Sequence, residues 1–62
     1  MKDLLGKHIK ANVYGTMYDG TVTNITDNTI VLEEDCGYSK LVKTLFINNI
    51  AAIEMRVPKN EK

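Results

Sequence analysis

The chain has 62 residues, of which 44% are hydrophobic, and its 8 lysine and arginine residues balance its 8 aspartate and glutamate residues. A domain of this length buries only about 60% of the surface of its unfolded chain, so one small core needs additional support. The single cysteine excludes an internal disulfide, and with the single histidine it cannot complete a structural zinc site. Self-association is the remaining common means of support.

The charge balance also limits the partners. A net charge of zero lacks the basic excess of domains that follow a phosphate backbone, so contact with nucleic acid has to rest on local geometry. No apolar run approaches the roughly 18 residues of a membrane span, and the start of the chain has no apolar stretch long enough for a signal peptide. We therefore expect a soluble, cytoplasmic protein with no membrane partner.

The first element in chain order is a single helical turn over residues 3–6, with Asp3 near its start and Gly6 able to end it. Such a turn is too short to be stable alone, so its leucines are expected to cover the open end of a sheet. Strict alternation of apolar and polar residues then predicts a half-buried strand over residues 8–14. Its inward face carries Ile9, Ala11 and Val13.

A hairpin turn at Gly15-Thr16 leads to a second strand, in which Tyr18, Gly20 and Val22 share one face. A glycine in the middle of a strand indicates a sharp bend or a close backbone approach, the device by which small barrels turn their corners. Residues 26–28 are typical of a tight turn, because aspartate and asparagine side chains bond to nearby backbone groups.

The third predicted strand covers residues 29–33, with Ile30 and Leu32 facing inward, and a polar loop follows over residues 34–39. The fourth covers residues 40–47 and is apolar on both faces, with Leu41, Leu45 and Ile47 on one and Val42 and Phe46 on the other. A strand buried on one side alternates with polar residues. This strand is therefore either covered on both sides or presents an apolar surface to a partner.

Asn48-Asn49 forms a short turn, and a fifth strand alternates over residues 53–57 until Pro58 ends it. Five short strands with no helix beyond the first turn predict an all-β fold, a strongly bent five-stranded SH3-like open barrel with a short N-terminal helical turn. One domain covers residues 1–58. The charged tail, 59–62, has nothing to bury and is expected to be disordered.

Four stretches carry a family resemblance: Gly6-Lys7-x-Ile9-x-Ala11-x-Val13, Gly15-x-x-Tyr18-x-Gly20-x-Val22-x-x-Ile25-x-Asp27, Ile30-Val31-Leu32 and Phe46-Ile47-Asn48-Asn49-Ile50-x-x-Ile53. This order resembles the Sm-like (LSm, Hfq-like) small β-barrel family, and most of all its small bacterial members. The resemblance implies a ring of identical subunits, in which the fourth strand of one subunit pairs with the fifth strand of the next. The interface residues would then be Val42, Phe46 and Met55.

The resemblance also implies an RNA site, because Sm-type proteins read uridine with the turn after the second strand and the turn before the last. Those two turns converge at one end of such a barrel, and here they carry Asp27, Asn28, Asn48 and Asn49. The places of the Arg-Gly of Sm proteins and of the Lys-His of Hfq are held here by Ile47, Asn48 and Asn49. Amide side chains offer both a donor and an acceptor to a base edge or a peptide backbone. The alternative is that these residues only serve the backbone of their turns.

The remaining candidates are isolated side chains. For Tyr14 and Tyr38 two interpretations stay open, stacking on a base and no binding role. Tyr18 is expected to pack in the core or at the barrel rim. His8 is expected at the surface or in an interface, and Cys36 has no neighbouring base to make it a nucleophile. The acidic run over residues 33–35 is interpreted as a solvated loop rather than a cation site. No catalytic motif is present, so we expect no enzyme, cofactor or metal.

Three functions remain open. The first is a non-enzymatic homo-oligomeric ring that binds single-stranded RNA weakly through the two turns. The second is a protein-interaction or scaffold module of SH3-like fold that binds a protein partner, or only itself, without nucleic acid. The third is an SH3-like monomer in which Val42 and Phe46 fold under the loop over residues 34–39.

Overall fold

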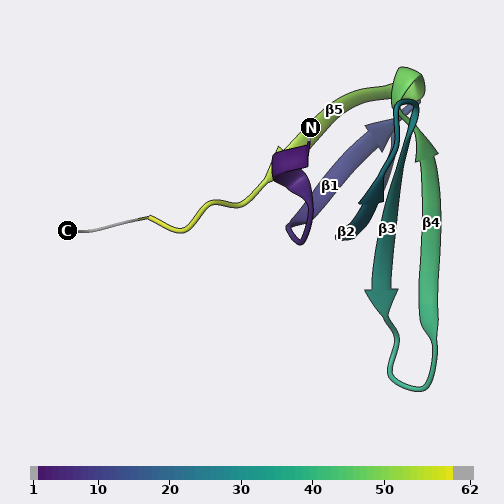
Figure 1. The fold of residues 1–62 in the computed structure, drawn as a ribbon, viewed down its shortest axis with the longest axis vertical. Helices are drawn as coiled ribbons and strands as arrows, with labels where there is room; N and C mark the ends of the chain where they lie inside the picture. The colour runs from purple at the N-terminus through teal and green to yellow at the C-terminus, as the bar shows by residue number, and fades with distance from the viewer. Residues whose placement is uncertain (1, 60–62) are drawn as a thin grey trace.

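The computed structural model describes residues 2–59. It contains one five-stranded antiparallel sheet in the order β4-β3-β2-β1-β5, and the only helical segments in this part of the chain are two short 3-10 turns, η1 and η2. The fold is therefore all-β, a strongly bent open barrel, as the sequence predicts (Figure 1). The elements are η1 (Lys2–Leu4), β1 (His8–Val13), β2 (Thr16–Ile25), β3 (Thr29–Asp35), β4 (Lys40–Phe46), η2 (Ile47–Asn49) and β5 (Ile50–Met55).

The core lies on the inner face of the bent sheet. It consists of the alternating apolar residues of β1 to β4, namely Ile9, Ala11, Val22, Ile30, Leu32 and Leu45. Leu4 of η1 packs against this cluster, whereas the neighbouring Leu5 is largely exposed, so one of the two leucines covers the core as expected. The backbone amide of Gly6 donates to the Val22 carbonyl at 2.8 Å and connects η1 to the sheet.

Gly20 in β2 lies very close to the neighbouring strand β3. A Cβ atom at this position would lie 3.0 Å from the carbonyl oxygen of Glu33 and 3.1 Å from the Cβ of Leu32. The predicted role of this glycine, a close approach between strands, is confirmed. Lys43 of β4 reaches across β3 to β2, because its Nζ donates to the backbone oxygen of Asp19 at 2.7 Å.

Two predicted boundaries near the hairpins are wrong. The first hairpin turns at Tyr14-Gly15, not at Gly15-Thr16, since both residues have positive φ (52° and 84°) and Val13 pairs directly with Thr16. Two positive φ values in a two-residue loop are the mark of a type I′ turn, whose twist matches that of the flanking strands.

The second wrong boundary is the end of the third strand, because β3 continues to Asp35. Glu34 and Asp35 pair with Leu41 and Lys40 of β4. The predicted loop over residues 34–39 therefore shortens to 36–39.

The last two strands also differ from the prediction. β4 ends at Phe46, because Ile47–Asn49 form η2, and β5 runs from Ile50 to Met55 rather than over 53–57. Its length follows from its partner, since β1 pairs with it from Val13 to Ile9. Except for Lys59, the tail over 59–62 lies outside the described residues. None of the helical segments between residues 2 and 59 has the length and apolar composition that a bilayer-spanning helix requires.

Candidate interaction surfaces

Two turns predicted to converge lie side by side at one end of the barrel, which we name the turn end: residues 26–28 and η2 (Figure 1). The backbone amide of Ile47 donates to the carbonyl oxygen of Asn28 at 2.9 Å and joins them. The structure therefore brings Asp27 and Asn28 together with Asn48 and Asn49. The two turns are joined by a backbone hydrogen bond, so this contact does not use their side chains.

The turn at residues 26–28 is closed by a threonine rather than by the aspartate. Thr26 Oγ1 accepts from the backbone amide of Thr29 at 3.0 Å and lies 2.6 Å from the Thr29 hydroxyl oxygen. Asn28 contributes its Oδ1 as an acceptor for the Thr26 hydroxyl at 3.3 Å. Within residues 2–59, the exposed side chains of Asp27 and Asn48 make no hydrogen bond. The backbone explanation therefore fits Thr26 and Asn28 better than Asp27 and Asn48.

A groove of about 370 Å³ adjoins the two turns. Apolar side chains and two opposite charges surround it, from Lys2, Ile25, Thr26, Asp27 and Ile47. Sequence reasoning missed the part played by Lys2, Ile25 and Ile47. No local pattern reveals it, because η1 is placed by tertiary contacts: Gly6 and Lys7, which follow it, bond to Val22 of β2, and Leu4 packs on the core.

The three tyrosines occupy different environments. Tyr18 is partly buried against the core, which confirms the packing role expected for it. Tyr38 is exposed in the β3–β4 loop, at the end of the sheet opposite to η2 (Figure 1). Tyr14 is exposed at the turn end, where its hydroxyl donates to Oδ1 of Asn49 at 3.1 Å.

The two outermost strands of the sheet form a second candidate surface. Within residues 2–59, β4 pairs only with β3 and β5 pairs only with β1, so each has one free edge. Val42 is 56% exposed and Phe46 is 57% exposed. The burial under the β3–β4 loop that the monomer hypothesis expects for these two side chains is therefore not seen. Leu41 on β4 and Met55 on β5 are exposed too.

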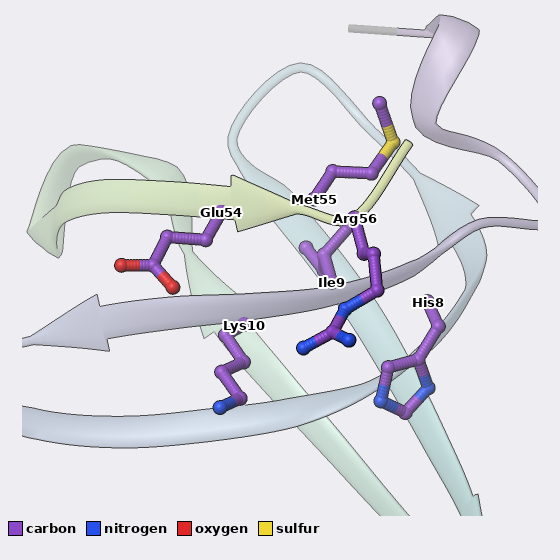
Figure 2. Close-up of a pocket in the computed structure, with 6 residues that line it drawn as sticks. All are labelled: His8, Ile9, Lys10, Glu54, Met55 and Arg56. Carbon is purple, nitrogen blue, oxygen red and sulfur yellow. The ribbon is translucent and has the colours of Figure 1, made fainter. Parts of the chain in front are cut away.

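A second groove, of about 410 Å³, follows β1 and β5 (Figure 2). His8, Lys10 and Arg56 point to the same side of it, away from Met55 (Figure 2). The register places Lys10 between Glu54 of β5 and Asp19 of β2, so a carboxylate residue flanks this lysine on each side. His8 is exposed, as expected. The sequence does not reveal this groove, because the groove forms only where β1 pairs with β5.

The acidic run lies on the β3–β4 hairpin and is matched by lysines. Glu33 lies 3.5 Å from Lys40, and Glu34 lies 3.0 Å from Lys43. In the part of the chain that the structure describes, no three histidine, cysteine or acidic side chains come together as a metal site. Cys36 is exposed, and its Sγ lies 3.7 Å from the Glu34 carbonyl oxygen.

Comparison with known proteins adds no relative: no protein-family model matches the chain, and no curated protein or solved structure shows significant similarity to it. Function therefore has to be argued from the turn end and the free sheet edges themselves.

Proposed function

We propose that the chain is a non-enzymatic, cytoplasmic Sm-like subunit that assembles with copies of itself into a ring and binds single-stranded RNA weakly at the turn end. The observation that carries the proposal is the pair of free edges on one small sheet, with exposed apolar side chains on β4. The adjacent turns, with the groove beside them, support the RNA part.

The free edges favour a second copy of the chain as the occupant. An unpaired strand presents backbone N–H and C=O groups that template pairing with another strand. β4 has 7 residues and β5 has 6, so each edge offers the other a partner of matching length. A contact between two different edges is head-to-tail, and such contacts generate closed rings when the rotation between subunits allows it.

The apolar side chains provide the driving force for this pairing. Fully burying one large apolar side chain contributes about 1.5–3 kcal/mol. Leu41, Val42 and Phe46 are each about half exposed on β4, and Met55 is exposed on β5. Their burial between subunits would supply the support that so small a core, with six buried residues between positions 2 and 59, lacks.

The turn end offers a single-stranded polymer three kinds of contact. The Asp27 carboxylate and the Asn48 amide have no hydrogen bond within residues 2–59, so both are available to a base edge. Ile25 and Ile47 supply apolar walls, and Lys2 supplies a cation for a phosphate. Repetition of the turn end around a ring would add avidity to a weak contact.

Two measurements on the intact protein test the proposal. Light scattering after size exclusion gives the mass, and fluorescence anisotropy with labelled oligo-U and oligo-A at low and physiological salt gives RNA affinity. We expect a defined multimer and salt-sensitive binding. A monomer at every concentration would contradict the ring. A multimer that binds neither polymer would remove the RNA part and favour the scaffold alternative, whose protein partner should survive nuclease treatment of a cell extract.

A further inference from the structure

The β1–β2 hairpin contains an unusual residue at its turn. Tyr14 has φ of 52°, and among residues 2–59 it is the one residue other than glycine with a positive φ. The left-handed region is unfavourable for a side chain with a Cβ atom, and two-residue hairpins of this type favour Asn-Gly or Gly-Gly. The turn itself is supported from Asn12, whose Oδ1 accepts from the Gly15 amide at 2.9 Å. Nothing in the turn requires an aromatic ring.

Burial does not explain the tyrosine either. The residue is 82% exposed, so its ring gains little from leaving water. Its hydroxyl donates to Asn49, 35 residues away, and this bond ties the side chain to η2 at the turn end. An exposed aromatic ring whose hydroxyl is anchored to Asn49 is held beside η2, in which the neighbouring residue, Asn48, is exposed as well.

We propose that Tyr14 is a stacking platform for an unpaired nucleobase. The inference rests on the proposed RNA function and deepens it, because neither turn predicted to bind RNA contains this residue. Every base has a π-face, so stacking on tyrosine suits a single strand of any sequence. Tyr14 occupies Oδ1 of Asn49, and the amide Nδ2 of Asn49 has no hydrogen-bond partner within residues 2–59. That donor can reach the carbonyl oxygens of a pyrimidine.

The chain has no tryptophan, so a single substitution introduces a unique fluorescent reporter. The test compares Tyr14→Trp with Tyr38→Trp, which places the same reporter in the exposed loop at the opposite end of the sheet. Each is titrated with oligo-U and with an abasic oligomer of the same length. We expect oligo-U to quench the indole at position 14, the abasic oligomer to leave it unchanged, and neither to affect position 38. Equal quenching at both positions, or none at position 14 when RNA binds, would overturn the inference.

Affinity measurements on three further variants separate stacking from folding. Tyr14→Asn removes the ring but suits a left-handed turn, so the barrel stays folded. We expect this variant to bind oligo-U about tenfold more weakly, the usual effect of losing one stacked base. Tyr14→Phe keeps the ring and should stay within about threefold of the wild type. Tyr38→Asn is the matched control and should bind like the wild type.

The outcomes distinguish this inference from the function on which it rests. If Tyr14→Asn binds RNA like the wild type, the stacking role is wrong while the RNA function stands. If Tyr14→Phe loses as much affinity as Tyr14→Asn, the hydroxyl contact with Asn49 is the determinant and the ring is not. If the wild-type protein binds no RNA, both proposals fail together.

Discussion

Gly20 of β2 lies directly against Leu32 of β3: a Cβ atom at position 20 would stand 3.1 Å from the Leu32 Cβ. The carbonyl oxygen of Glu33 would be nearer still, at 3.0 Å. The absence of a Cβ atom at this buried position allows β2 to approach β3 closely. The close approach has a direct consequence for mutation.

Gly20→Ala should destabilise the barrel by about 1–3 kcal/mol, because the added methyl group meets backbone and a packed side chain that cannot give way freely. Urea unfolding followed by circular dichroism measures the effect. Gly37→Ala is not a suitable control, since Gly37 has φ of 92°. Gly37→Asn tolerates that conformation in open space and should change stability by less than about 0.5 kcal/mol. If Gly20→Ala had the same urea midpoint of unfolding as the wild type, the close approach at position 20 would be contradicted.

Lys43→Met should cost about 1–2 kcal/mol of stability, because it removes charged hydrogen bonds while keeping a long side chain. The lysine is only 17% exposed and contacts the Asp19 backbone oxygen at 2.7 Å and Glu34 Oε1 at 3.0 Å. Lys40→Met on the same strand is the control. Lys40 is 68% exposed and lies 3.5 Å from Glu33, so its substitution should lower the free energy of unfolding by less than about 0.5 kcal/mol. Equal effects of the two substitutions in thermal unfolding would show that the partly buried contacts of Lys43 add no stability beyond that of an exposed ion pair.

Phe46→Glu should lower the mass of the assembly in solution and leave the circular dichroism spectrum of the barrel unchanged. A carboxylate between two subunits would be buried without a partner, whereas at the surface of a single subunit it stays solvated. Met17→Glu is the matched control, since Met17 is 49% exposed but lies on the central strand β2. A wild-type mass for Phe46→Glu in light scattering would exclude Phe46 from the subunit interface.

Asn48→Ala should weaken binding of labelled oligo-U about tenfold, within the range for one lost amide–base pair. The melting temperature should not change, because the Asn48 side chain makes no hydrogen bond within residues 2–59. Ser39→Ala, in the loop at the far end of the β3–β4 hairpin, is the control and should bind RNA normally. Undiminished affinity of Asn48→Ala would place the RNA site away from η2.

Much of the fold follows from the sequence because side chains alternate between the two faces of a strand. That period alone assigns Ile9, Ala11, Ile30 and Leu32 to the core, where the structure places them. A glycine in the middle of a strand, at position 20, likewise predicts the close approach between β2 and β3, and this signal is also local. The ends of the elements were less predictable. Glu34 and Asp35 are residue types typical of loops, and they belong to a strand because they pair with Leu41 and Lys40.

The sequence by itself determined the inward faces of the first three strands, the special position of Gly20 and the presence of two polar turns, because these depend on neighbours within a few residues. Only the tertiary structure decided which surfaces exist. The strand order leaves β4 and β5 with free edges, and it brings Tyr14 within 3.1 Å of Asn49, although 35 residues separate them along the chain. Such contacts depend on how the whole sheet curves, and the free energy of that curvature is shared among all the strands rather than encoded in any one of them.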